Sequence, residues 1–505
     1  MTRVLLMAVM LCGVSQAARV GITGSRQLTL EDAVTMALRD NLDVRIERSN
    51  VASAQEAEVG SRGIYDPVFR FQPQLQILNT PSPSILAGQN GRASEHDFVG
   101  SAGYRQRGWQ GAIFDLSADG GRTSTNNPFI GLNPYYTSQV RLGVTQPLLR
   151  GRTIDAERAL IRIRAVQTGM ARTQLELRAI DTVTRVVEAY WDLATARDSA
   201  EVNREAADLA RTQLEQNRRM IAAGSLAAIE LSASEAELER RLDHWYAALD
   251  DITTAENNLK QLIAPHREDP VWSQELIVET GQEKVPTAAG GLTEAVAAAL
   301  KARPELRGIG QELAVNGIEE QQNADQIRPA LNLVASYSNA GLTGTPREAF
   351  GPLLAVFGPL PPLQPDGRFH SVQAGLNFEW TAHNRQTRAN LEQSAIGERK
   401  LKLQRTRVEQ SIEAQVRNAM QSLETARQRI AAAEAGTRAA REKLDSEQRL
   451  FSTGESTNFL VLTRQNEYSD ARQRLLAARL YFNKAIARFE EAVGETLSAR
   501  RLVLD

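Results

Sequence analysis

The chain has 505 residues, a length that would divide into about three globular domains of ordinary size. Its 59 basic and 61 acidic residues are interspersed, so no basic block of the kind that binds nucleic acid is present. Aromatic residues make up only 5%, while Gln, Arg, Ala, Leu and Glu are concentrated in residues 152–264 and 386–493. That composition is typical of long solvated helices rather than of a compact enzyme core.

The N-terminus has the pattern of an export signal over residues 1–17. Arg3 supplies a positive charge, an apolar stretch follows, and residues 15–17 resemble a signal-peptidase site. Cleavage there would remove Cys12, the only cysteine. The alternative is a lipoprotein anchored through Cys12, but Leu11 stands where a lipidation signal has a small residue. No run of 18 apolar residues follows, so we expect any membrane contact to be made through a closed β-barrel.

The rest of the chain carries one series of motifs twice. Residues around Leu30 recur around Leu292 at an offset of 262, and residues around Gly224 recur around Gly454 at an offset of 230. The first copy therefore has 32 additional residues, which follow its Pro67. Ordered matches of proline, glycine and charge favour a duplication over chance similarity of two alanine-rich stretches. The predicted divisions are a first repeat over 18–285, a second repeat over 286–495 and a C-terminal tail over 496–505.

Each repeat predicts the same order of elements: two short amphipathic helices, a proline, strands, a very long helix, a glycine and another long helix. A helix of about 70 residues spans about 105 Å, a length that favours a coiled-coil tube over a globule. Strands are expected at about 67–147 and about 330–381. The helices are expected at 30–39, 43–62, 153–222 and 225–264 in the first repeat, and at 292–301, 305–325, 386–452 and 455–493 in the second.

Apolar and polar residues alternate in the strand regions, for example from Phe69 to Ile77 and from Val372 to Trp380. A barrel strand between lipid and water requires this pattern, although a half-buried strand of a soluble sandwich has it as well. The turn-rich stretches between the strands are expected to be extracellular loops. These stretches are 79–96, 121–137 and 341–370.

The additional residues of the first repeat contain a hairpin with arms near 98–104 and 112–118. The sequence allows two arrangements of it. In one, the arms join the barrel and the chain contributes six strands. In the other, which we favour, the chain contributes about four strands and the hairpin is an extended loop outside them.

Three motifs carry a resemblance to a known family. The stretch from Leu28 to Ala33 resembles the opening of the TolC family of outer-membrane efflux proteins. The stretch from Thr145 to Gly151, with Gln146 and Pro147, resembles the strand-to-helix transition of that family, and 378–385 is a looser second copy. The glycine turns resemble the helix-turn-helix tips of the family. In two ordered copies, the resemblance covers nearly all of 28–495.

The resemblance implies an α+β membrane protein, a trimeric channel-tunnel. A transmembrane β-barrel embedded in outer-membrane lipid would be continuous with a long α-helical coiled-coil barrel that extends into the periplasm. The resemblance also implies a homotrimer that works with a periplasmic adaptor (a membrane fusion protein) and with an inner-membrane pump or ABC exporter.

The resemblance implies two kinds of site at the tips. The adaptor would dock beside the tip glycines, which a helix reversal needs because glycine tolerates a positive φ. Family members often have acidic residues after these glycines that narrow a periplasmic aperture. Glu230 fits that pattern, whereas Leu460 and Thr463 depart from it, so either a ring of Glu230 or an apolar Leu460 constriction would close the aperture. The docking residues would be Gly224, Ser225, Leu226, Gly454, Glu455 and Ser456.

The sequence shows no catalytic constellation. Its five histidines have no metal-binding spacing, and its glycine pairs lack the lysine of a phosphate-binding loop. We expect no enzymatic activity, no cofactor and no metal. The predicted function is a passive exit duct of a tripartite efflux or type I secretion system, opened by adaptor docking. The alternative is a periplasmic coiled-coil scaffold or adaptor without a pore, and only the export signal favours a secreted hydrolase.

Overall fold

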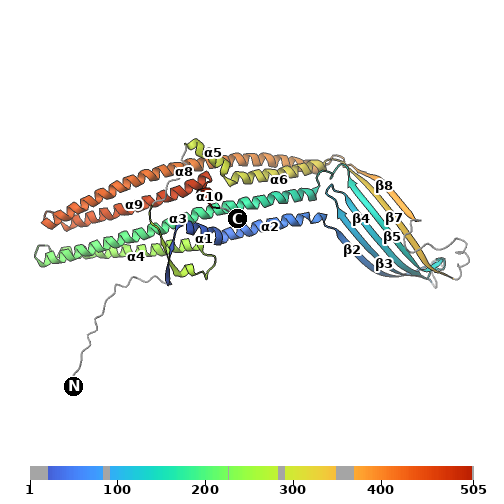
Figure 1. The fold of residues 1–505 in the computed structure, drawn as a ribbon, viewed down its shortest axis with the longest axis horizontal. Helices are drawn as coiled ribbons and strands as arrows, with labels where there is room; N and C mark the ends of the chain where they lie inside the picture. Colours follow the sequence, from blue (N-terminus) through green and yellow to red (C-terminus); the bar gives the residue numbers. More distant parts are fainter. Residues whose placement is uncertain (1–20, 84–90, 226, 282–290, 348–368, 503–505) are drawn as a thin grey trace, which may run out of the picture. The chain divides into compact units, whose positions relative to one another are not determined.

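The computed structural model describes residues 21–83, 91–225, 227–281, 291–347 and 369–502 (Figure 1). The predicted export signal with Cys12, the tip residue Leu226 and parts of the expected loops lie outside the described residues. The chain forms two compact units. The first contains residues up to 51, 171–309 and 404 onward, and the second contains 52–170 and 310–403.

All eight predicted helices form, with ends that shift by a few residues. In Figure 1, α3 lies beside α4 and α8 lies beside α9, so each of these two pairs forms a helical hairpin. The helices are α1 (Leu30–Asp40), α2 (Leu42–Ser61), α3 (Ala156–Ala222), α4 (Ile229–Ile263), α5 (Leu292–Ala302), α6 (Pro304–Gln326), α8 (Arg385–Thr453) and α9 (Asn458–Val493), and a short α10 (Thr496–Ala499) follows them.

The main core of the first unit surrounds a small sheet that the sequence analysis did not predict. Strands β1 (Gly24–Leu28) and β6 (Gln274–Val278) pair in parallel. Helix α1 begins there because the Thr29 side chain caps it, accepting a hydrogen bond from the Asp32 N–H at 3.1 Å. The buried Tyr190 hydroxyl of α3 donates to the Leu28 carbonyl (3.2 Å). These contacts join the start of the first repeat to its long helix.

A buried ion pair lies in the same unit, on α4. The Lys260 ammonium is 2.6 Å from a Glu256 carboxylate oxygen, and their side chains are only 1% and 3% exposed. Lys260 also donates to the Trp272 carbonyl at 3.3 Å. Removing one partner of such a pair is costly because the other charge stays away from water.

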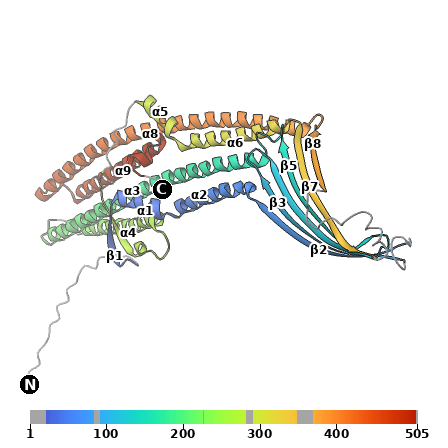
Figure 2. The same ribbon diagram turned by 45° about the vertical axis from the view of Figure 1, so that its right-hand side comes forward.

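The second unit is built on one antiparallel sheet of six strands, in the order β2-β3-β4-β5-β7-β8. Figure 2 shows that this sheet is curved. Its strands are β2 (Val68–Pro81), β3 (Arg92–Arg107), β4 (Ile113–Thr125), β5 (Leu132–Pro147), β7 (Ala330–Pro346) and β8 (His370–Glu379).

The additional hairpin of the first repeat is part of this sheet. Its arms, β3 and β4, lie between β2 and β5 and pair with them along nearly their whole lengths. The favoured expectation of four strands with an outlying loop hairpin is therefore corrected to six strands. The strands also extend into the expected loops, since β2 reaches Pro81, β4 reaches Thr125 and β7 reaches Pro346. In these stretches, the backbone N–H and C=O groups form hydrogen bonds between neighbouring strands, and this stabilisation is larger than the preference of the residues for turns.

Lys260→Met should lower the free energy of unfolding by roughly 3–5 kcal/mol, because Glu256 then loses the cation closest to its carboxylate. The double variant Lys260→Met with Glu256→Gln should recover much of that loss. Chemical denaturation in detergent, monitored by the circular dichroism signal of the helices, measures the free energy of unfolding of both variants. Equal stability of the single and double variants would show that the pair is not coupled in this way.

Candidate functional site

The sheet has two chemically different faces. Directly opposed residues of neighbouring strands lie on the same face of a sheet, so the register assigns each residue to a face. One cross-strand row consists of Phe69, Tyr104, Leu116, Leu142, Tyr337 and Val372. The adjacent row, on the opposite face, consists of Arg70, Gly103, Ser117, Arg141, Ser338 and Ser371.

The apolar face is exposed in the single chain. Phe69 is 76% exposed at one edge and Val372 is 70% exposed at the other, with Leu142 50% exposed between them. Large apolar side chains exposed over a whole sheet mark a surface that contacts something other than water. The register therefore provides a wall with one apolar and one polar side.

The two glycine turns have the same geometry. Gly224 has a φ of +74° and Gly454 a φ of +79°. The N–H of the following residue, Ser225 or Glu455, bonds back to the carbonyl five residues earlier, at 2.9 Å in each turn. A Cβ on either glycine would meet nothing within 4 Å, so backbone conformation rather than crowding requires glycine. The two turns thus share their hydrogen bonding as well as their backbone conformation.

A cluster of buried polar side chains lies next to these turns and joins the two hairpins. Asn458, the first residue of α9, is its centre. The Asn458 amide oxygen accepts from Asn217 of α3 at 2.8 Å and from Gln213 at 3.3 Å. Its amide nitrogen donates to Glu230 at 3.0 Å and to Ser234 at 3.3 Å, both on α4. We call these five residues the tip cluster.

Burial makes the tip cluster energetically important. Asn217 is fully buried and Asn458 is 2% exposed, so a broken bond there leaves a polar group without water. The next layer repeats the connection. The Arg241 guanidinium of α4 bonds to Glu237 on its own helix and to Asn466 and Ser469 on α9. Sequence analysis missed both layers, although polar residues at spacings of three or four on one helix face were visible in it.

The predicted aperture residues have different settings. Glu230 belongs to the tip cluster and is half-buried, so in a single chain it is bonded to Asn458. Leu460 is exposed, and the Thr463 hydroxyl bonds to the Phe459 carbonyl of its own helix at 2.8 Å. The predicted tip residues Ser225 and Glu455 are exposed, and Ser456 bonds to Glu447. The structure thus brings Glu230 near Asn458, a residue that the sequence analysis did not single out.

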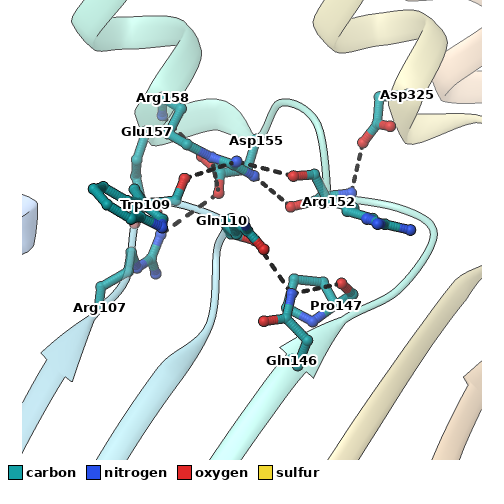
Figure 3. A network of polar contacts seen from close by, with 11 residues as sticks. Arg107, Trp109, Gln110, Gln146, Pro147, Arg152, Asp155, Glu157, Arg158 and Asp325 are labelled. Atoms are coloured by element: carbon teal, nitrogen blue, oxygen red, sulfur yellow. Dashed lines mark hydrogen bonds and ion pairs between the residues drawn. The ribbon is translucent and has the colours of Figure 1, made fainter.

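The strand-to-helix transition is fixed by a network of polar contacts at the end of β5 (Figure 3). Gly151 has a φ of +77°, and its N–H donates to the buried Asp325 carboxylate at 2.6 Å. The Arg158 side chain donates to the carbonyls of Gly151, Arg152 and Trp109, and it pairs with Asp155 at 3.1 Å. One guanidinium thus bonds to three carbonyls of two backbone segments, the turn at Trp109 and the stretch Gly151–Arg152.

The turn between β3 and β4 packs closely against this transition. A Cβ on Gly111, which has a φ of +80°, would come within 3.0 Å of the Gly151 carbonyl oxygen and 3.1 Å of Pro147. Gln146 donates to the carbonyls of Gln110 and Pro147, at 3.3 and 2.9 Å. Gln146, Pro147 and Gly151 therefore shape the corner between strand and helix, and they hold the inserted hairpin against it.

One carboxylate on α3 has a perturbed pKa. Burial raises the pKa of Asp198, and the charges of Arg479 and Arg472 on α9 lower it by less. A folded-state pKa above the ordinary value means that the folded chain holds this proton more tightly than the unfolded chain. The contribution of Asp198 to stability is therefore present at low pH and falls as the pH rises through the raised pKa.

Within the described residues, no group of three or more His, Cys, Asp or Glu is arranged to hold a metal ion. In the same part of the chain, no helix is both long and apolar enough to cross a membrane.

Arg158→Met should destabilise the corner by about 3 kcal/mol, because three backbone carbonyls lose their donor. Trypsin should then cleave after Arg107, where β3 ends and the adjacent turn begins, faster than in the parent protein. Arg162→Met, an exposed site one turn later on α3, is the control and should change neither the cleavage rate nor the thermal unfolding midpoint. Equal cleavage of both variants would contradict the role given to Arg158.

Comparison with known proteins agrees with this architecture. A model of the outer membrane efflux protein family matches residues 111–264 and 295–495. No curated protein matches the chain with significance. Three solved structures illustrate the shared fold. The CmeC outer membrane channel of Campylobacter jejuni is 14% identical, with 92% of this chain and 86% of that chain covered and a TM-score of 0.64.

The outer membrane protein VceC of Vibrio cholerae is 13% identical, with 92% of this chain and 96% of that chain covered and a TM-score of 0.64. The open state of the MtrE outer membrane channel of Neisseria gonorrhoeae is 17% identical, with 93% of this chain and 89% of that chain covered and a TM-score of 0.59. At these identities the structures establish the TolC-like α+β fold, and the family model matches both repeats. The chain therefore belongs to the outer membrane efflux protein family and serves export through the outer membrane.

Proposed function

We propose that three copies of the chain form a passive exit duct that spans the outer membrane and continues into the periplasm. The duct would serve a tripartite efflux or type I secretion system. A periplasmic adaptor would dock at the tips, and an inner-membrane pump or ABC exporter would supply the energy. The observation that carries this proposal is the two-faced sheet, since a channel wall needs lipid on one side and water on the other.

The sheet suits the membrane part of such a duct. Its apolar rows would face lipid, and rows such as the one containing Arg70 and Arg141 would line the water-filled interior. Strands of 10 to 17 residues are long enough to cross a hydrocarbon layer at a tilt, for which about 9–11 residues are needed.

The tip turns suit the docking of a partner. Five residues after each glycine, at equivalent positions of the two hairpins, stand Ile229 and Phe459, which are 73% and 72% exposed. Apolar side chains exposed beside two turns of the same geometry offer an adaptor two similar contacts. We therefore assign docking to Gly224, Gly454 and the residues that follow them.

The tip cluster suits a mouth that opens on docking. It bonds α9 to both α3 and α4, so separating the hairpins would require Asn458 to leave four partners. An adaptor could bind the exposed tips, and its binding energy could offset the loss of the buried hydrogen bonds of the tip cluster. In the assembled duct, Glu230, Leu460 and Thr463 would line the periplasmic aperture.

Asn458→Ala should make the duct open more often, because the hairpins lose their central hydrogen-bonding residue. We expect a higher open probability in planar bilayers without any adaptor present. Gln428→Ala is the control, since that amide is exposed and donates to Glu424 on its own helix at 3.0 Å. A closed-channel behaviour unchanged by Asn458→Ala would remove the tip cluster from the gating mechanism.

Gly454→Pro should abolish export while leaving the sheet intact, because the proline ring fixes φ near −65° and cannot adopt the +79° of this turn. Transport by the reconstituted system measures export. A heat-resistant oligomer band on gels shows that the sheet is intact. Normal export by this variant would show that the turn at Gly454 is not a docking tip.

A further inference from the structure

The six-stranded sheet ends in two edges, β2 and β8. Because the strands alternate in direction and are even in number, β2 and β8 run in opposite directions. All 14 residues of β2 and all 10 of β8 are exposed in the single chain. A sheet edge presents backbone N–H and C=O groups that lipid cannot satisfy, so both edges need a strand beside them in a membrane.

The register within the sheet shows how the strands step past one another. The row from Phe69 to Val372 serves as the reference. Counted from that row toward the helices, β2 extends by one residue to Val68, β5 by five to Pro147 and β8 by seven to Glu379. The ends thus shift by six residues over five steps between strands, a mean of about 1.2 residues a step.

This stagger has the size that a closed barrel needs. With a rise of about 3.3 Å per residue and about 4.8 Å between strands, it corresponds to a tilt of about 40°. Strands of closed barrels tilt by about 35–45°. A sheet without stagger would have no tilt. Because the stagger of this sheet gives the tilt of a closed barrel, the sheet of one chain already has the geometry of a barrel segment.

We propose that β8 of one copy pairs antiparallel with β2 of the next copy, with Glu379 opposite Arg70. A sixth step at the observed stagger gives a shift of about seven residues. Only an even shift keeps the apolar rows on one face, and eight is the even number nearest to the extrapolated value. This inference rests on the proposed function, in which three copies form the duct, and it specifies how their sheets join.

The chemistry across the proposed junction is complementary. The shift of eight sets the Glu379 carboxylate against the Arg70 guanidinium on the polar face, and cross-strand pairs of opposite charge stabilise a sheet. On the apolar face it sets Phe378 opposite Phe71 and Val372 opposite Ile77. All ten residues of β8 gain a partner within β2, and Pro73, opposite Leu376, is the one member of that stretch without an N–H.

The closed ring would then contain eighteen strands, six from each of three copies. With about 4.8 Å between strands and a tilt of about 40°, its backbone diameter would be about 36 Å, against about 24 Å for twelve strands. Barrels of 16–18 strands leave an aqueous channel. The hairpin of β3 and β4, which only the first repeat contains, accounts for the additional width.

Cysteine pairs on the polar face test this register. The mature-region sequence offers a clean background because Cys12 is the only cysteine of the chain. Gln76→Cys combined with Gln373→Cys places two cysteines directly opposite across the junction. Oxidation in isolated outer membranes should link copies into dimers and trimers on non-reducing gels. Gln72→Cys with Gln373→Cys, four residues out of register, is the matched control and should link at least tenfold less.

Two other results would overturn the proposal. Efficient linking of Gln74→Cys with Gln373→Cys, but not of the Gln76 pair, would mean a shift of six and a different register. Imaging of the intact trimer that shows twelve strands would contradict the width. Neither result would affect the exit duct itself, whereas monomeric particles that form no links with any pair would contradict the duct as well.

A charge exchange gives an independent reading. Arg70→Glu and Glu379→Arg should each lower the temperature at which the trimer dissociates in detergent, because each sets like charges opposite one another. The double exchange should recover the part of the loss that comes from the Arg70 contact, whereas the repulsion between an arginine at 379 and Arg150, which lies 3.4 Å from Glu379 in the same chain, remains. If the effects of the two single variants simply add in the double variant, Arg70 and Glu379 do not face each other.

Discussion

Opposed residues on neighbouring strands must share a face, and in this sheet that constraint acts across six strands at once. The row that begins at Phe69 remains apolar through Leu116 and Leu142 to Val372, and the adjacent row remains polar. A slip of one residue at any pair would mix the two faces. The assignment of lipid to one side and water to the other, and the direction in which copies can join, both depend on this register.

The helical part is held together by a different kind of interaction. Its hairpins are joined at their tips by buried amides and a carboxylate rather than by apolar side chains alone, and Asn458 bonds to residues of both α3 and α4. Apolar contacts would hold the hairpins without defining when they separate. A polar cluster holds one arrangement strongly and loses most of its stabilisation once a partner residue moves away, which suits a two-state mouth. Away from the tips, the Lys260 pair and the Tyr190 contacts fix the core from which the hairpins extend.

Much of this architecture could be predicted from the sequence because it is periodic and duplicated. The helices of the two repeats, the alternating strands and the two glycine turns all leave local signals, and glycine at 224 and 454 has the positive φ that a reversal needs. The placement of the additional hairpin could not be predicted in the same way, since alternation at Phe98 and Leu116 is equally compatible with a loop hairpin and with a sheet strand. The pairing of β1 with β6 joins segments about 250 residues apart, and five-residue strands carry too little pattern to reveal it.

The tip cluster shows a second limit of sequence reasoning. Glu230 was found because it follows a glycine at a recognisable distance, but its partner Asn458 could be identified only when α9 was placed beside α4. The corner at Gly151 could be predicted from the sequence only in part. Its glycine and proline are visible in the sequence, whereas the contribution of Arg158 depends on a turn about 50 residues away.

The two faces of the sheet can be compared most directly by labelling two adjacent residues of β5. Arg141→Cys and Leu142→Cys would be probed in intact outer membranes with a water-soluble, membrane-impermeant maleimide. The account predicts rapid labelling at position 141, which faces the water-filled interior, and little labelling at position 142, which faces lipid. Equal labelling at both positions would contradict a channel wall and would leave the sheet surrounded by water on both sides.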